Sequence, residues 1–270
     1  MNPAPATKVL SWHIELTAVP APSQTRLTAI LDEITASMKT IPFEEKARAY
    51  DAKAIALSHL NLEQESLAAH QNACKLDAHD FVLVFNMAVT LQKFHRYGES
   101  LDKHAEALDM EGGYNPLVLA SLARTLAHLG EMEEARKALN EALRLSTQDT
   151  VGDLRGLAAA AASLGLHTEA VELIARGLRC QRGRPRGDEP ALTVLSEHAD
   201  ALADWLAWDT ALQYSVAWVE QWQGRMPELS RLVASMPPGG KGDETAWDEV
   251  FEATRGMRAR ANAAAEDSHG

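Results

Sequence analysis

Small residues recur along this chain of 270 residues with a period of 34 or 35. Five aligned segments begin at residues 47, 81, 116, 151 and 192, and the first four follow this period, while about seven extra residues precede the fifth. The eighth residue of every segment is alanine: Ala54, Ala88, Ala123, Ala158 and Ala199. The twentieth is always small: Ser66, Ser100, Ala135, Ala170 and Ala211. A fixed internal period of this length indicates an array of repeated supersecondary units.

The positions of small and large residues within each segment predict pairs of helices. The twenty-seventh residue is small in the first four segments: Ala73, Ala107, Ala142 and Gly177. The fourteenth is a large apolar residue in all five: Leu60, Phe94, Leu129, Leu164 and Trp205. Two antiparallel helices approach closely only where side chains are small, while larger apolar residues fill the space around the contact. The pattern therefore predicts an all-α protein.

The pattern resembles the tetratricopeptide repeat (TPR) family, whose helix–turn–helix unit has small residues at the eighth, twentieth and twenty-seventh positions. Residues 84–110 and 119–145 match best, and Gly130 and Gly165 stand where the first helix of a pair should end. The resemblance implies a right-handed α-solenoid of about five TPR-type repeats with helical caps. It departs from the family at the thirty-second position, where a proline is common: this chain has Ala78, Gly112, Thr147, Arg182 and Gln223.

The chain is expected to have four regions. These are a flexible N-terminal segment (1–22), a capping helix (23–46), the repeats (47–225) and C-terminal helices with a tail (226–270). The repeats are expected at 47–80, 81–114, 116–149, 151–184 and 192–225. The apolar patch Val9–Leu16 is short enough for a strand, or for a segment that docks on the repeats or on a partner. Trp218 replaces a small residue in the fifth repeat, so the tryptophan-rich end is either the core of a cap or a binding surface.

Composition and charge limit the classes of partner. No apolar run approaches the ~18 residues of a membrane-spanning helix, and the N-terminus has no secretory signal, so we expect a cytoplasmic protein of bacterial type. Residues 188–270 carry 15 acidic and 6 basic side chains, against 23 and 20 in residues 1–187. The acidic C-terminal third disfavours nucleic-acid binding and would suit a basic protein client.

No sequence motif points to catalysis, a cofactor or a metal. His70 and Cys74 have the spacing of half a metal site, but His104 recurs at the same repeat position as His70, which favours a packing role for both histidines. The two cysteines, Cys74 and Cys180, are expected to be reduced packing residues. We therefore predict no catalytic residue, no metal site and no cofactor, and no enzyme activity.

The resemblance implies a concave groove lined by the second, fifth, ninth, twelfth and thirteenth positions of each repeat. The residues expected to contact a partner there are His59, Phe85, Val89, Lys93, Arg124, His128, Arg155, Ala159, Ala162, Asp200 and Asp204. The alanine run 158–162 is expected to leave the groove wide, with Arg124 and Arg155 available to a carboxylate. Asp51 and Ile55 replace the lysine and asparagine of the family's chaperone-tail class, so that ligand is not expected.

A basic cluster, Arg179, Arg182, Arg184 and Arg186, is either a site for an anion or acidic partner or a solvated loop. The sequence as a whole predicts an adaptor or scaffold that binds a partner protein or peptide in the groove. The alternatives are a chaperone or inhibitor that masks a secreted or toxic partner, a non-catalytic subunit of an enzyme complex, and an enzyme.

Overall fold

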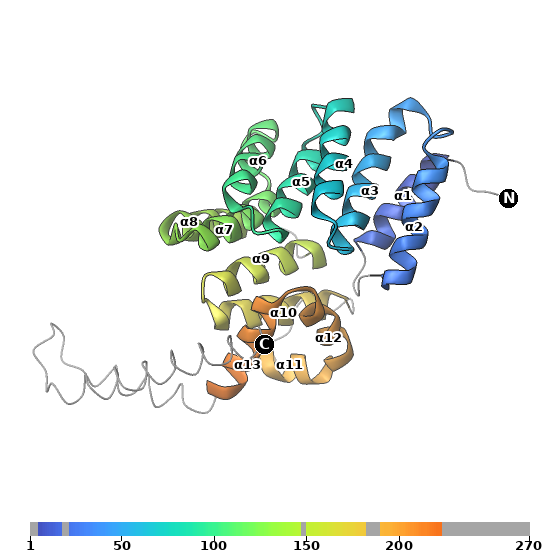
Figure 1. Cartoon of the computed structure of the whole chain (residues 1–270). Coiled ribbons are helices and arrows are strands. Elements are labelled where there is room, and N and C mark those ends of the chain that lie inside the picture. Colours follow the sequence, from blue (N-terminus) through green and yellow to red (C-terminus); the bar gives the residue numbers. More distant parts are fainter. Residues whose placement is uncertain (1–4, 18–21, 147–149, 182–189, 223–270) are drawn as a thin grey trace, which may run out of the picture. The chain divides into compact units, whose positions relative to one another are not determined.

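The structure, a computed structural model, describes residues 5–17, 22–146, 150–181 and 190–222 (Figure 1). These residues form thirteen α-helices and one short 3-10 helix, and no strand occurs among them. None of the described helices combines the length and the apolar composition needed to cross a membrane. The chain divides into two compact units, residues 1–217 and 218–270, and the first of them holds the repeats.

Two helices precede the repeats, α1 (Pro5–Leu16) and α2 (Gln24–Ser37), followed by the 3-10 turn η1 (Phe43–Glu45). The first four repeats supply a pair of helices each: α3 (Lys46–His59) and α4 (Glu63–Leu76), α5 (Phe81–Lys93) and α6 (Tyr97–Met110), α7 (Pro116–Leu129) and α8 (Met132–Leu145), α9 (Val151–Ser163) and α10 (His167–Gln181). Three helices follow: α11 (Ala191–Glu197), α12 (Ala199–Trp208) and α13 (Thr210–Trp222).

The helix pairs stack in chain order. The two helices of each of these four repeats pack on one another most extensively, and the second helix then packs on the first helix of the next repeat (Figure 1). The step from the third to the fourth repeat differs, because α9 packs mainly on α7 and only slightly on α8. The prediction of an all-α array of helical hairpins is confirmed.

The small residues of the repeat pattern are buried in the four regular pairs. At the eighth, twentieth and twenty-seventh positions the side chains of the first three repeats are fully buried, as are Ala158 and Ala170 of the fourth. In the first two repeats the twentieth residue also bonds across the pair. Ser66 Oγ donates to the carbonyl of Ala54 at 2.8 Å, and Ser100 Oγ donates to the carbonyl of Ala88 at 2.9 Å. Each bond joins the twentieth position to the eighth, so the hydroxyl links the two helices of the pair.

The turn between the helices of a pair has a left-handed residue at the fifteenth position of each regular repeat. These residues are Asn61 (φ 58°), His95 (φ 59°), Gly130 (φ 84°) and Gly165 (φ 72°). Glycine adopts this conformation without the steric cost that a Cβ carries, and asparagine tolerates it. The predicted helix-ending role of the two glycines is confirmed, and His95 is the least favourable residue of the four for this turn.

The fifth segment departs from the two-helix unit that the alignment predicts. The backbone leaves the helical conformation at His198 (φ −123°, ψ 33°), which separates α11 from α12, and again at Asp209, which precedes α13. Ala199, at the eighth position, is exposed, because it is the first residue after the break instead of the middle of a helix. Trp205 and Val216 are nevertheless buried, so the segment still covers the end of the array.

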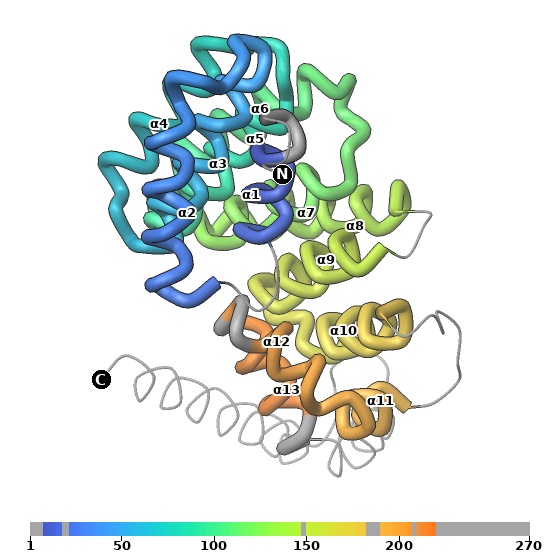
Figure 2. Tube along the Cα trace, turned by 90° about the vertical axis from the view of Figure 1, so that its right-hand side faces the viewer, coloured from blue at the N-terminus to red at the C-terminus, as the bar shows by residue number. Residues whose placement is uncertain are grey.

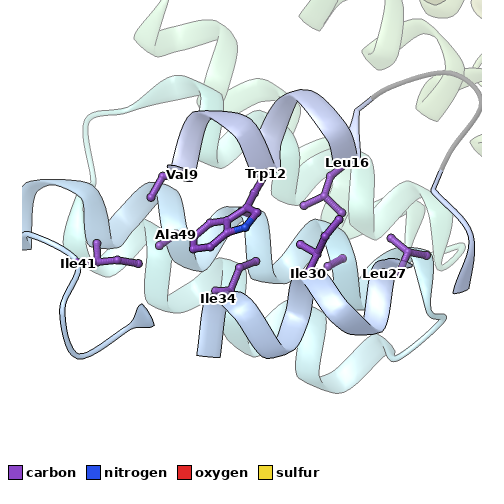
Figure 3. Packing of buried hydrophobic residues seen from close by; sticks show 10 residues of the cluster. Val9, Trp12, Leu16, Leu27, Ile30, Ile34, Ile41 and Ala49 are labelled. Atoms are coloured by element: carbon purple, nitrogen blue, oxygen red, sulfur yellow. The ribbon is translucent and has the colours of Figure 1, made fainter. Parts of the chain in front are cut away.

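The N-terminal segment also differs from the sequence-based expectation, which was a flexible stretch with a strand or docking segment at Val9–Leu16. Residues 5–16 instead form helix α1, which packs on α2 and α3 (Figure 3). Val9, Trp12 and Leu16 lie on one side of α1 and are no more than 2% exposed. A 12-residue helix is marginal alone, so the tertiary contacts of this apolar side stabilise it.

Candidate functional site

Helix α1 packs at three of the five positions of the first repeat that are expected to line the groove. We call the second, fifth, ninth, twelfth and thirteenth positions of the repeats the inner-face positions. Asp51 (fifth) lies 3.1 Å from His13 Nε2, and His59 (thirteenth) places its Nε2 3.1 Å from the carbonyl oxygen of Leu16. Ile55 (ninth) packs against the cluster that contains Trp12. In Figure 2, α1 lies beside α3 on the side away from α4.

Asp51 joins α1 to the helices around it. Its side chain is fully buried, and Asn86 Nδ2 of α5 donates to Oδ2 at 2.8 Å. His70 of α4, also fully buried, places Nδ1 3.2 Å from Oδ1. Burial by itself raises the pKa of Asp51, but the hydrogen bonds from His13 and His70 outweigh it, so that the pKa lies below its ordinary value. The carboxylate therefore stays ionised in the folded protein at neutral pH.

The inner-face positions of the second and third repeats are the more accessible ones. Val89 of α5 and Leu117 of α7 are 36% and 38% exposed, and Lys93 and His128 are also exposed. Phe85 is half-buried, with its ring edge-on to His104. The inner-face residue Gln92 is buried instead, where it donates to Ser121 O and Thr125 Oγ1. These two repeats therefore offer an apolar surface beside a lysine and a histidine.

Arg124, which was expected to be available to a partner's carboxylate, forms an ion pair within the chain. Its Nη2 lies 2.6 Å from Asp209 Oδ2, and the two side chains are 19% and 8% exposed. Asp209 also accepts a hydrogen bond from the backbone N–H of Ala211 and so caps the start of α13. The expectation of two arginines free for a ligand is therefore corrected at Arg124.

The fourth repeat does not have the wide groove that the alanine run suggested. Ala159 is fully buried, as are Ala158, Ala160 and Ala161, and Ala162 is 7% exposed. A helix without long side chains is approached closely by its neighbours, here α7 and α10. Leu117 Cδ1 lies 3.3 Å from where a Cβ of Gly156 would be. Arg155 is half-buried, and burial lowers its pKa.

The remaining candidate residues are dispersed. Asp200 is exposed and Asp204 half-buried, both on α12. Arg179 is half-buried on α10, and the other three arginines of the basic cluster, Arg182, Arg184 and Arg186, lie outside the described residues. The expected C-terminal helices, residues 226–270, lie outside them as well.

The histidines at the twenty-fourth repeat position are packing residues, as the sequence indicated. His70 Nε2 lies 2.9 Å from Thr90 Oγ1, and His104 Nε2 lies 2.8 Å from Ser121 Oγ, in each case a hydroxyl of the following first helix. Burial lowers the pKa of His104 to about 4, so its ring is neutral. The described residues include no cluster of three or more His, Cys, Asp or Glu side chains that could hold a metal ion.

Two contacts could not be predicted from the sequence, His13 with Asp51 and Arg124 with Asp209. His13 gave no signal because it stood in a segment expected to be flexible. Asp209 lies 85 residues beyond Arg124, and its only local signal was that of a helix cap before Thr210.

Comparison with known proteins supports the architecture. No protein-family model and no curated protein sequence matches the chain. Among solved structures, the thermophilic TPR protein TTC0263 of Thermus thermophilus is similar with a TM-score of 0.53 and 18% identity, over 74% of this chain and 97% of that one. MamA of Desulfovibrio magneticus RS-1 has a TM-score of 0.43 and 16% identity, over 68% and 100% of the two chains. YrrB, described as a TPR protein with an unusual peptide-binding site, has a TM-score of 0.38 and 20% identity, over 67% and 96%.

The similarity to TTC0263 agrees with the helix pairs, the buried small residues and the left-handed turns described above. The chain therefore has the fold of the tetratricopeptide repeat proteins.

Proposed function

We propose that the chain is a protein-interaction scaffold that binds a segment of a partner protein across the inner-face positions of the second and third repeats. The observation that carries the proposal is the exposure of apolar side chains there. Val89 and Leu117 are large, apolar and more than a third exposed, whereas α1 covers the first repeat and the alanines of the fourth are buried. An exposed apolar surface on a repeat array is typical of a protein-binding site.

A lysine and a histidine nearby define what such a segment should present. Lys93 and His128 are exposed at the thirteenth positions of these two repeats. His128 stacks on Tyr97 with ring centroids 4.5 Å apart, which holds the imidazole in place. A partner segment with apolar anchors and a carboxylate would complement this surface.

The test uses peptides selected by phage display on the full chain, with affinity then measured by calorimetry. Leu117→Asp should weaken binding at least tenfold, because it places a charge among apolar contacts. Leu143→Asp is the matched control, because Leu143 is also 38% exposed but lies on α8, away from the inner-face positions. Equal affinity of the two variants would show that the partner binds elsewhere.

The other functions suggested by the sequence remain predictions. A chaperone or inhibitor would bind a full-length basic client, while an enzyme or enzyme subunit would bind a small molecule or a catalytic chain. Native mass spectrometry of the purified chain distinguishes a bound small molecule from a bound protein.

A further inference from the structure

Helix α1 lies on the first repeat at the positions where, under the proposed function, a partner lies on the next two. It contacts Asp51 and His59, the fifth and thirteenth positions, and Ile55, the ninth, packs against the apolar cluster to which α1 contributes. The same positions of the second repeat are Phe85, Val89 and Lys93. Within this chain, α1 therefore behaves as a ligand that is covalently attached to its own binding surface.

The surface that receives α1 has an apolar and a polar part, and we call it the α1 seat. Its main residues are Leu27, Ile30 and Ile34 on α2, with Ala52, Asp51 and His59 on α3. Figure 3 shows Trp12 of α1 above Ile34, and Leu16 beside Ile30. Trp12 also donates from Nε1 to Glu33 Oε2 at 3.1 Å.

The two parts of the seat respond differently if α1 leaves. Asp51 keeps the hydrogen bond from Asn86 Nδ2 at 2.8 Å, and His70 Nδ1 stays 3.2 Å from Oδ1, so the buried carboxylate keeps one donor and a nearby imidazole. Ile30 and Ile34, which are fully buried under α1, would meet water. The polar part therefore tolerates the exchange of α1, while the apolar part requires that another apolar segment replace it.

The spacing of the α1 side chains specifies that replacement. The buried apolar residues are Val9, Trp12 and Leu16, at i, i+3 and i+7, which form one face only in a helix. His13, at i+4, points at Asp51. Leu10 and Ile14 are 60% and 64% exposed and so lie on the other side of the helix.

We propose that the α1 seat is an exchangeable helix-binding site. It takes from a partner protein an amphipathic helix with large apolar side chains at i, i+3 and i+7 and a basic side chain at i+4 that pairs with Asp51. The proposal rests on the proposed function, since it extends the partner surface onto the first repeat. A short tether gives α1 an effective concentration of about 1 mM or more, so a competing helix binds poorly until α1 is released.

The experiment uses a fluorescent peptide of residues 5–17, PATKVLSWHIELT, as the competing helix and measures its anisotropy with three full-length chains. Trp12→Asp disables the internal α1 and should bind the peptide at least tenfold more tightly than the wild type. Ile14→Asp changes the exposed side of α1 and should bind it as weakly as the wild type. A peptide that carries Trp12→Asp should bind none of the chains.

Several results would overturn the proposal. One is equal peptide affinity for the wild type and the Trp12→Asp chain, and another is no binding to a Trp12→Asp chain that unfolds cooperatively. Dimers of the Trp12→Asp chain in light scattering would point to a second copy as the occupant. If Trp12→Asp does not fold, His13→Ala should still tighten peptide binding, because it removes the contact with Asp51 together with the local contact between His13 Nδ1 and the Val9 carbonyl. Loss of folding in both variants would make α1 an obligatory part of the core.

A further variant distinguishes failure of the helix-exchange proposal from failure of the scaffold proposal. Leu117→Asp lies outside the α1 seat and should leave binding of the peptide to the Trp12→Asp chain unchanged. If Leu117→Asp weakens the phage-selected partner but the α1 peptide binds no chain, the exchange proposal fails and the scaffold proposal stands. If the α1 peptide binds as expected while no partner depends on Leu117, the scaffold proposal fails instead.

Discussion

The indole of Trp205 lies against the backbone of Gly177, so close that a Cβ built on this glycine would come within 2.2 Å of ring atom Cη2. Trp205 is 1% exposed, and it is the fourteenth residue of the irregular fifth segment. Gly177 holds the twenty-seventh position, where the three preceding repeats have alanine. The absence of a side chain at Gly177 therefore leaves the space that the indole of Trp205 occupies.

Gly177→Ala should therefore destabilise the protein, although alanine favours a helix. We expect the free energy of unfolding to fall by about 1–3 kcal/mol, the range typical of overpacked cores. Urea denaturation measures the change. Gly152→Ala is the control, because a Cβ there meets only Thr150 Oγ1 at 4.0 Å, and it should be neutral or stabilising. A stabilised Gly177→Ala chain would contradict the packing described here.

His95→Gly should stabilise the protein. His95 has φ 59°, and the equivalent residues of the next two repeats are Gly130 and Gly165. Relief of the left-handed strain should raise the free energy of unfolding by about 1 kcal/mol. Loss of the contact between His95 Nδ1 and Tyr97 OH at 2.7 Å reduces this gain. Thermal unfolding measures the gain. Gly130→His should show the reverse effect, and a lower melting temperature for His95→Gly would argue against strain at this turn.

The buried serines at the twentieth position give a prediction that can be tested in both directions. Ser100→Ala removes the hydrogen bond to the Ala88 carbonyl and should lower the free energy of unfolding by about 0.5–1.5 kcal/mol. Ala135→Ser, at the same position of the third repeat, should be tolerated, because its hydroxyl would have the carbonyl of Ala123 as an acceptor. Chemical denaturation of both variants checks the pair. Equal destabilisation would mean that the volume of the site, and not the hydrogen bond, decides.

His104 should make stability fall in mild acid. Burial lowers its pKa to about 4 from 6.5, so the unfolded chain binds a proton at pH values where the folded chain does not. Stability is therefore lost as the pH falls from about 6.5 to about 4, by about 3 kcal/mol in total. Unfolding free energies at pH 7 and pH 5 should differ more in the wild type than in His104→Gln. The same pH dependence in both chains would mean that His104 is not the group responsible.

Arg124→Ala should destabilise the protein, because it leaves the largely buried carboxylate of Asp209 without its cation. We expect the free energy of unfolding to fall by about 2–3 kcal/mol. This is less than for a fully buried ion pair, because Arg124 is 19% exposed. The double variant Arg124→Ala with Asp209→Asn should recover part of it. Arg144→Ala removes an exposed pair with Glu141 and should leave the melting temperature unchanged. Equal effects at the two sites would argue against a role for burial.

Several features of the four regular repeats could be predicted from the sequence. The alanines and serines at the eighth and twentieth positions indicated helix contacts, and Gly130 and Gly165 indicated turns, because each depends on local size or backbone freedom. Helix α1 could not be predicted, because its stability comes from contacts with α2 and α3. The alanine run 158–162 predicts open space, but the sequence does not say how closely α7 and α10 approach it.

The position of Asp51 has a consequence for how the protein unfolds. Arrays of repeats usually gain stability from each unit and its nearest neighbour, so their ends can fray one unit at a time. Asp51 contacts His13 of α1, His70 of α4 and Asn86 of α5, which belong to three successive units. Because α3, α4 and α5 share this buried charge even when α1 leaves, their amide protons should exchange with solvent in a single cooperative step.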